Sequence, residues 1–170
     1  MFQFSFLFTL VKEGVISDIY LQNEDYFGKY REEIKKLFSD DINYLPYVAV
    51  HVRRGDYVDN SFYVDLFKEG YYEKAMKKFP NATFLVFSDD IEWCEKQPVF
   101  KDCKFAKGNG EVHDLNLMAS CEGHIIANSS FSWWGAYLNR NKSKKVFAPK
   151  PWTDSHNDDV YFNGMITVPR

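Results

Sequence analysis

The sequence lacks the features by which several common classes of protein are identified. It has three cysteines in 170 residues, an odd number with no C-x-x-C pair, so we expect neither a disulfide framework nor a zinc site. No apolar run is long enough to cross a membrane. A net charge of −3 offers no basic surface for nucleic acid. These absences favour a reducing compartment, with the protein cytoplasmic or peripheral to a membrane.

Two common nucleotide-binding motifs are also missing. The sequence contains neither the G-x-G-x-x-G turn of dinucleotide-binding folds nor the G-x-x-x-x-G-K-[ST] phosphate loop. Its four histidines, His51, His113, His124 and His156, show no spacing typical of metal ligands. We therefore expect no metal, and any phosphate group would have to be bound by side chains.

What is present is the pattern of a globular α/β protein. The apolar content of 45% and the charged content of 26% are ordinary, and 170 residues suffice for one domain with a full core. Short apolar runs that predict strands cover residues 47–52, 83–87, 104–106, 124–128 and 145–148. Helical patterns cover residues 23–39, 71–79, 91–96, 112–121 and 133–138. This alternation predicts a Rossmann-like parallel sheet with helices on both faces.

A charged cluster follows the first predicted strand, in the sequence HVRRGDY (51–57). Arg53 and Arg54 come where the strand should end, and an arginine fork can bind two phosphate oxygens at once. Gly55 allows a sharp turn or a close approach to a ligand. Asp56 can hold a guanidinium or accept a hydrogen bond from a ligand hydroxyl. The cluster suggests a diphosphate-binding loop, although a surface turn with an Arg–Asp ion pair explains it equally well.

Polar clusters follow two further predicted strands. They are Ser88, Asp89 and Asp90 after the second strand, and Asn128, Ser129, Ser130 and Ser132 after the fourth. The carboxyl ends of parallel strands meet at one edge of the sheet, where ligands bind in open α/β folds. Small hydroxyl residues that open a helix present backbone N–H groups to phosphate, and a carboxylate can accept hydrogen bonds from guanine or ribose. Together the clusters predict a nucleotide site.

Each cluster also has a purely structural explanation. Asp89 and Asp90 can cap the helix that follows, or they resemble an Asp-x-Asp metal motif without its middle residue. The serines can form only a helix cap, and His51 can be a hydrogen-bonded strand residue. Trp133 and Trp134 are more typical of a core than of ligand stacking. Asp114 is interpreted as a first-turn carboxylate of its helix.

Four blocks of the sequence resemble glycosyltransferase family 11, the α-1,2-fucosyltransferases. They are HVRRGDY (51–57), VFSDDIEWC (86–94), DLNLMASCEGHIIANSSFSWWGAYL (114–138) and KVFAPKPW (145–152). The resemblance implies the C-terminal nucleotide-binding lobe of a GT-B glycosyltransferase, with a GDP-fucose-binding domain at residues 21–152. Residues 1–20 would then be an unassigned apolar segment, and residues 153–170 a tail without a clear pattern.

The resemblance further implies an inverting transfer of L-fucose from GDP-fucose to a terminal galactose of a glycan, without metal or cofactor. By similarity, Arg53 and Arg54 would bind the diphosphate and stabilise it as it leaves, and Asp56 would join them in the catalytic set. The remaining nucleotide-sugar contacts implied are His51, Asp89, Asp90, Asn128, Ser129, Ser130 and Ser132. The catalytic base stays unassigned among Asp56, Asp59 and Asp65 or the other lobe.

The sequence departs from the family at its start, because it shows no Gly-Gly-x-Gly-Asn-Gln-type segment and no N-terminal lobe. A second hypothesis is therefore a non-catalytic GDP-sugar-binding lobe that needs a partner lobe or a second copy. The apolar residues 2–8 would favour such association, or contact with a membrane surface, including the Golgi membrane for a secretory-pathway enzyme. A third hypothesis is another nucleotide-dependent α/β enzyme, assisted by a metal at Asp89 and Asp90.

Overall fold

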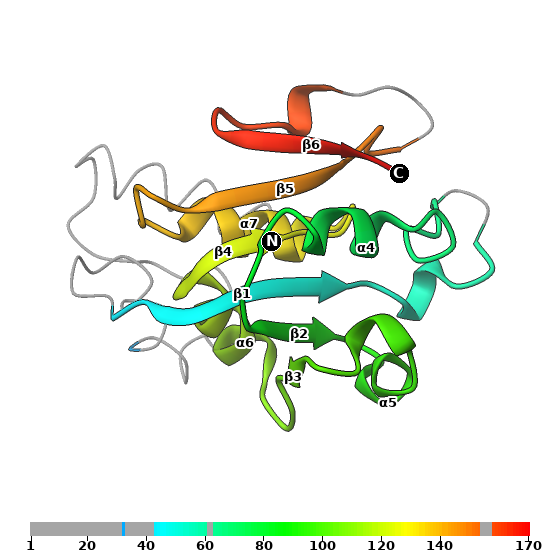
Figure 1. Ribbon diagram of the computed structural model, residues 1–170, viewed down its shortest axis with the longest axis horizontal. Helices are drawn as coiled ribbons and strands as arrows, with labels where there is room; N and C mark the ends of the chain where they lie inside the picture. Colours follow the sequence, from blue (N-terminus) through cyan, green and yellow to red (C-terminus); the bar gives the residue numbers. More distant parts are fainter. Residues whose placement is uncertain (1–31, 33–42, 61–62, 154–157) are drawn as a thin grey trace.

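A parallel sheet forms the centre of the molecule. The computed structural model describes residues 32, 43–60, 63–153 and 158–170. The segment 1–20, His156 and, apart from Glu32, the predicted helix at 23–39 therefore lie outside the described residues. All strand pairs are parallel, in the order β3-β2-β1-β4-β5-β6 (Figure 1). The strands are β1 (Leu45–Val52), β2 (Phe84–Ser88), β3 (Lys104–Phe105), β4 (Cys121–Ile125), β5 (Lys145–Lys150) and β6 (Met165–Pro169).

Helices cover both faces of this sheet, as predicted. They are α4 (Tyr71–Met76), α5 (Ile91–Glu95), α6 (Glu111–Ala119) and α7 (Ser130–Leu138). One core cluster joins α4 and α5 to one face, and separate clusters join α6 and α7 to the other. Figure 1 shows α4 in front of the sheet and α6 and α7 behind it. The chain therefore has the Rossmann-like α/β fold that the sequence predicts.

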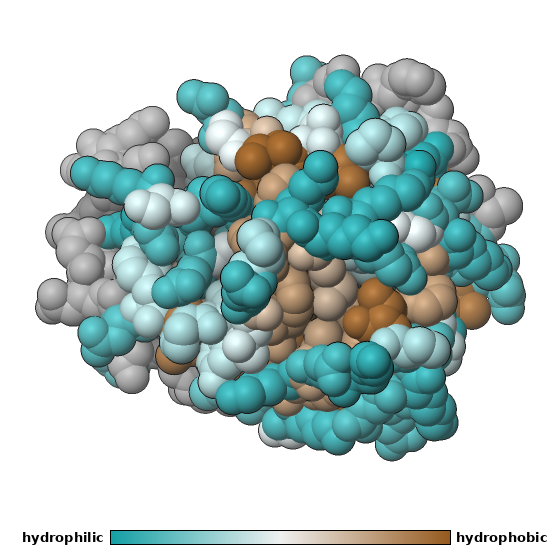
Figure 2. Space-filling view, in the orientation of Figure 1, coloured by the Kyte–Doolittle hydropathy of each residue, from teal (hydrophilic) through white to brown (hydrophobic). Residues whose placement is uncertain are grey.

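The alternation of side chains along β1 explains why both faces are apolar. Successive side chains of a strand point to opposite faces, so Val48, Val50 and Val52 pack in the cluster with α4, and Ala49 packs in the cluster with α6. All four are buried. Figure 2 shows the α4 face, where apolar side chains are visible between polar ones over β1 and β2. A strand buried on both faces reads as a continuous apolar run, which is why it was recognisable from sequence.

The boundary between α6 and β4 differs from the prediction. The sequence pattern extends the helix to Cys121 and starts the strand at His124, whereas Cys121 begins β4, which ends at Ile125. The pairing of Leu45 with Cys121 fixes this start. Gly123 makes the segment look unlike a strand, but a Cβ there would lie 2.8 Å from the ring of Phe79. The packed ring replaces the missing side chain, so tertiary contact decides the element.

The last strand also comes from a segment that sequence leaves without a pattern. β6 lies within residues 153–170 and pairs with β5 from Val146–Met165 to Lys150–Pro169. Pro149 predicts the end of β5, yet it lies inside that strand. The pairing of β5 with β4 stops at Phe147, so the missing N–H of Pro149 falls where that ladder has ended. The segment 153–170 thus contributes a sheet strand as well as loops.

The cysteines and the helices bear on the disulfide-rich and membrane-spanning classes of protein. Cys94, Cys103 and Cys121 are all free thiols. No helix in the described ranges is both long and apolar enough to span a bilayer.

Candidate functional site

The strand order creates a crevice between β1 and β4. These two strands are neighbours in the sheet, although β2 and β3 lie between them in the sequence. The chain leaves their carboxyl ends in opposite directions, which is the switch point where open α/β sheets bind ligands. A cavity of about 550 Å³ lies at this edge, and we call it the switch-point cavity. Its lining includes His51 from β1, Arg53 and Asp56 after β1, Asp89 after β2, Glu111 and Asp114 from α6, and Ser129 and Ser130 after β4.

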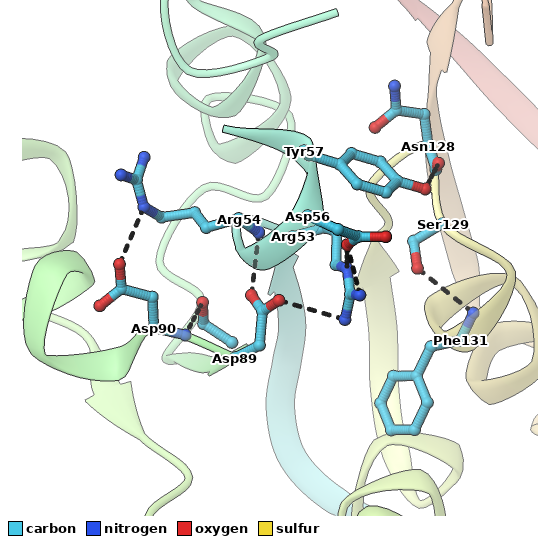
Figure 3. A network of polar contacts seen from close by, with 10 residues as sticks. Arg53, Arg54, Asp56, Tyr57, Asp89, Asp90, Asn128, Ser129 and Phe131 are labelled. Atoms are coloured by element: carbon cyan, nitrogen blue, oxygen red, sulfur yellow. Dashed lines mark hydrogen bonds and ion pairs between the residues drawn. The ribbon is translucent and has the colours of Figure 1, made fainter. Parts of the chain in front are cut away.

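Two carboxylates clamp the Arg53 guanidinium at this cavity (Figure 3). Its Nε and Nη2 donate to Asp56 Oδ1 at 3.1 and 2.6 Å, and its Nη1 lies 3.1 Å from Asp89 Oδ2. Burial alone lowers the pKa of Arg53, but the hydrogen bond to Asp56 and the charge of Asp89 raise this pKa above its usual value. Arg53 is therefore a fixed cation whose fork is occupied by carboxylate oxygens.

Asp89 is held in place by the backbone of the loop. Its Oδ1 accepts the Arg54 backbone N–H at 2.8 Å. A Cβ on Gly55 would lie only 2.5 Å from Asp89 Oδ2. Only glycine leaves room for this carboxylate, which explains the glycine between the arginines and Asp56.

Arg54 lies on the other side of the loop, against α5. Its Nε donates to Asp90 Oδ2 at 3.1 Å, and its guanidinium carbon lies 3.6 Å from the centroid of the Trp93 ring. Figure 3 shows its side chain directed away from Arg53 and Asp56. Arg54 does not line the switch-point cavity. Both arginines follow the end of β1 at Val52, and Arg54 precedes the 3-10 turn Gly55–Tyr57. The bend of the loop there separates the two side chains.

Both of the predicted helix caps are present. Asp90 Oδ1 accepts the backbone N–H of Trp93 at 3.1 Å at the start of α5. Ser129 is the N-cap of α7, and its Oγ accepts the backbone N–H of Phe131 at 3.4 Å. Asp90 has no place in the lining of the switch-point cavity, whereas Ser129 does. Helix capping therefore fully explains the position of Asp90, but it explains only part of the role of Ser129.

The start of α7 brings backbone N–H groups to the cavity. Ser129 and Ser130 line the cavity at the first turn of this nine-residue helix. The N-terminus of a helix attracts anions through its unpaired N–H groups and its dipole. Ser132, the third residue of α7, is fully buried and donates its hydroxyl back to the carbonyls of Ala127 and Ser129. Ser132 therefore supports the turn from within and does not reach the cavity.

His51 is a buried, neutral wall of the same cavity. Burial, with a smaller effect from the Arg53 charge, lowers the pKa of His51 from 6.5 to about 3. Its Nδ1 has no hydrogen-bond partner in the described part of the chain. Its ring lies 5.5 Å from the ring of Phe131. His51 can thus donate or accept one hydrogen bond, but it brings no positive charge to this site.

A second, smaller cavity of about 30 Å³ lies on the far side of Tyr57. Arg54 and Asn128 line it, while Arg53 and Tyr57 line both cavities. The Tyr57 hydroxyl donates to the Asn128 carbonyl at 3.0 Å. The Tyr57 ring stacks on Tyr63 with 3.6 Å between centroids. Burial and the neighbouring Tyr63 raise the pKa of Tyr57 to about 12. The two stacked tyrosines therefore form an aromatic wall between the cavities.

The structure divides the ten predicted site residues into three groups. His51, Arg53, Asp56, Asp89, Ser129 and Ser130 meet at the switch-point cavity. Arg54 and Asn128 line only the smaller cavity, and Asp90 and Ser132 line neither. Of the alternative bases, Asp65 lines the smaller cavity, where its Oδ1 accepts the backbone N–H groups of Phe67 and Lys68.

Sequence reasoning missed other cavity residues, among them Tyr57, Tyr63, Glu111 and Asp114. Asp114 is a first-turn residue of α6, as predicted, but it also lines the switch-point cavity. Burial raises the pKa of its carboxyl, against the hydrogen bond from Asn109 at 2.9 Å, which lowers it. The available signal was its place at the start of the 114–138 block, four residues after Gly110, where the loop that closes a strand ends.

The charges that line the switch-point cavity are unequal. In the described lining, Arg53 is the single lysine or arginine, against the four carboxylates of Asp56, Asp89, Glu111 and Asp114. No three metal-ligating side chains gather in the described ranges. The carboxylates of Asp89 and Asp90 diverge toward different arginines. A ligand of this cavity would need one anionic end for Arg53 and α7, and hydrogen-bond donors for the carboxylates.

Comparison with known proteins identifies a family to which this sequence is similar. A family model described as "Glycosyl transferase family 11" matches residues 14–163. An "Alpha-1,2-colitosyltransferase" of Escherichia coli is 41% identical over 158 residues, which cover 77% of this chain and 53% of the relative. The "O-antigen biosynthesis glycosyltransferase WbnK" of Escherichia coli is 31% identical over 175 residues, which cover 86% of this chain and 58% of the relative.

A third relative comes from a mammal. The "Galactoside 2-alpha-L-fucosyltransferase Sec1" of Mus musculus is 37% identical over 105 residues, which cover 54% of this chain and 28% of the relative. The chain spans about half the length of the two bacterial relatives it matches.

Proposed function

The chain belongs to glycosyltransferase family 11, and from this premise we propose that it binds GDP-fucose and transfers L-fucose to a galactose of a glycan in α-1,2 linkage. The observation that carries the proposal is the position of Arg53. Its guanidinium lines a cavity of about 550 Å³ at the switch point of the sheet, and the start of α7 lines the same cavity. Anion-binding groups from two separate strand ends thus converge where a nucleotide diphosphate would lie.

The diphosphate would bind to Arg53 and to the first turn of α7 at Ser129 and Ser130. As the bond to the sugar breaks, negative charge develops on the leaving phosphate. A preorganised cation and helix N–H groups stabilise that charge without a metal ion. Each charge-assisted hydrogen bond contributes about 1.5–3 kcal/mol. Attack from the face opposite the leaving diphosphate would then invert the anomeric centre.

The acidic part of the cavity suits the neutral end of the donor. Guanine offers N–H donors at N1 and N2, and ribose offers hydroxyls, so carboxylates can bind both. Asp114 and Glu111 at the start of α6 are placed for this role, because they line the same cavity as Arg53. A base with hydrogen-bond acceptors in place of the guanine N1 and N2 donors would be repelled by the Asp114 carboxylate. For this reason we propose GDP over other nucleotides.

The sugar transferred has two candidates. Relatives named as galactoside fucosyltransferases support fucose and a galactose acceptor. The relative that is 41% identical is named for colitose, so GDP-colitose is the second candidate donor. The acceptor base stays unassigned. Asp56 is the one of its three candidates that lines the switch-point cavity. A chain that binds GDP-sugars without transferring them is the alternative to an enzyme.

The first test is calorimetric titration of the chain with GDP-fucose, GDP-mannose and UDP-galactose in the presence of EDTA. We expect binding of the GDP-sugars and not of UDP-galactose, because recognition rests on the guanine and no metal is required. Transfer to lactose is then followed by mass spectrometry. Binding without transfer would select the non-catalytic alternative, and binding that disappears with EDTA would contradict metal independence.

Arg53→Lys tests the assignment of the diphosphate. Lysine keeps the charge but not the planar fork, so we expect GDP affinity to fall about tenfold or more, on the scale of one charge-assisted hydrogen bond. Arg140→Lys, an exposed position outside both cavities, is the matched control and should bind like the parent. An unchanged affinity in Arg53→Lys would remove Arg53 from the site.

A further inference from the structure

We propose that Asp56 occupies the place of the donor diphosphate on the Arg53 guanidinium, and that donor binding exchanges one anion for the other. This inference rests on the proposed function and changes the role of Asp56. The sequence places Asp56 with the arginines in the catalytic set, where it can hold a guanidinium or accept a hydrogen bond from a ligand hydroxyl. The structure instead points to a carboxylate that competes with the donor for its principal cation.

The contact between the two residues uses the part of the guanidinium that binds phosphate best. Nε and Nη2 of Arg53 form one edge of the fork, and both donate to Asp56 Oδ1, at 3.1 and 2.6 Å. The same edge binds two oxygens of a phosphate. A diphosphate can therefore take this edge only when the Asp56 carboxylate leaves it.

The two carboxylates on Arg53 are held very differently. Asp89 also accepts the Arg54 backbone N–H, is wedged against Gly55, and its side chain is 27% exposed. The Asp56 side chain is 64% exposed, and the polar contacts found for its carboxylate in the described ranges are those with Arg53. Asp89 is thus a fixed support, whereas Asp56 can rotate into solvent. Only Asp56 is free to exchange.

The charge balance of the cavity favours such an exchange. Arg53 faces two carboxylates at once, and Glu111 and Asp114 add further negative charge to the lining. A diphosphate that entered while Asp56 stayed in place would face four carboxylates around one arginine, and it would face three once Asp56 had turned away. When Asp56 turns away, Arg53 keeps Asp89 as its support and gains the diphosphate as its partner. In the absence of donor, Asp56 returns and keeps the guanidinium paired.

The test compares GDP binding by the parent chain, Asp56→Asn and Asp56→Ala, using calorimetry at fixed salt. Removal of a competing exposed ion pair should tighten GDP binding by about 1.5- to 5-fold, with alanine giving the larger effect. Guanosine, which has no phosphate, should bind the three proteins equally. Asp102→Asn, at an exposed carboxylate outside both cavities, removes the same charge and should leave GDP affinity unchanged.

The outcomes separate this inference from the proposed function. Tighter GDP binding with unchanged guanosine binding supports the exchange, and so does GDP binding that appears only in the Asp56 variants. If the parent binds GDP and the variants bind it equally or more weakly, Asp56 supports Arg53 and the exchange is wrong, while the donor site stands. If no protein binds GDP, the donor site itself is wrong and the exchange falls with it. Circular dichroism of each variant establishes that it is folded.

Discussion

The loop after β1 has two sides that use the same residue types in opposite ways. On the cavity side, Arg53 faces Asp56 and Asp89 at the edge of a large cavity, and its side chain is 34% exposed. On the α5 side, Arg54 pairs with Asp90, and its guanidinium lies over the Trp93 ring. One arginine remains accessible to an anionic ligand, and the other fastens the loop to a helix.

The difference teaches that two charged residues adjacent in sequence need not have side chains that act at the same place. The Arg53 and Arg54 side chains point apart in Figure 3, so one loop can carry a ligand contact and a structural contact at consecutive positions. The cation over Trp93 contributes about 0.5–2 kcal/mol. The clamp on Arg53 is more exposed and contributes less to stability, since exposed ion pairs are worth about 0–1 kcal/mol. Stability and binding should therefore separate between the two sides.

Gly55→Ala breaks both sides at once and should have the largest effect. The new Cβ would lie 2.5 Å from Asp89 Oδ2, so the carboxylate that supports Arg53 and the Arg54 backbone must move. We expect a loss of about 1–3 kcal/mol in the free energy of unfolding, measured in urea, together with a loss of GDP binding. In an Asp89→Ala background the same substitution should cost much less, because the two effects are not additive. Equal costs in both backgrounds would show that the close contact is not the cause.

Acid should destabilise the cavity side through His51. Its folded pKa, about 3, lies below the unfolded value of 6.5, so the unfolded chain binds more protons. The stabilisation is fully present above pH 6.5 and is lost as the pH falls toward 3. At pH 5 the loss should be about 2 kcal/mol for His51.

The buried His124 has the same lowered pKa, again about 3, and adds an equal amount away from this loop. His51→Gln should therefore remove about half of the histidine contribution to the difference between urea unfolding at pH 7 and pH 5. His124→Gln is the matched control and should remove the other half. A pH dependence that neither variant changes would place the proton uptake elsewhere.

Replacement of each arginine by methionine compares the two sides of the loop directly, and its expected effect on stability is the smallest of these predictions. Arg54→Met loses the contact with Trp93 and the pair with Asp90, so stability should fall by about 1 kcal/mol while GDP affinity changes little. Arg53→Met should give the reverse result, with GDP binding lost and stability nearly unchanged. Urea unfolding measures the stability of both variants, and calorimetry measures their GDP affinity. A loss of GDP binding in both would mean that both arginines touch the donor.

Several features of the fold were readable before the structure. The runs at 47–52 and 83–87 are apolar on both faces, because helices cover both faces of the sheet, and such runs predict buried parallel strands. Other elements depended on partners distant in sequence. Gly123 lies in a strand because the Phe79 ring covers it, and β6 exists because β5 offers it a parallel edge.

The site divides in the same way. The sequence by itself determined the apolar runs of β1 and β2 and the order of the polar clusters that follow β1, β2 and β4, because apolar periodicity and turn residues are local properties. It also determined the family, through blocks that carry most of these clusters. Only the tertiary structure decided which members converge, because strand order and side-chain direction are set by long-range packing. That packing brought Arg53, Asp89, Asp114 and Ser129 to one cavity and turned Arg54, Asp90 and Ser132 away from it.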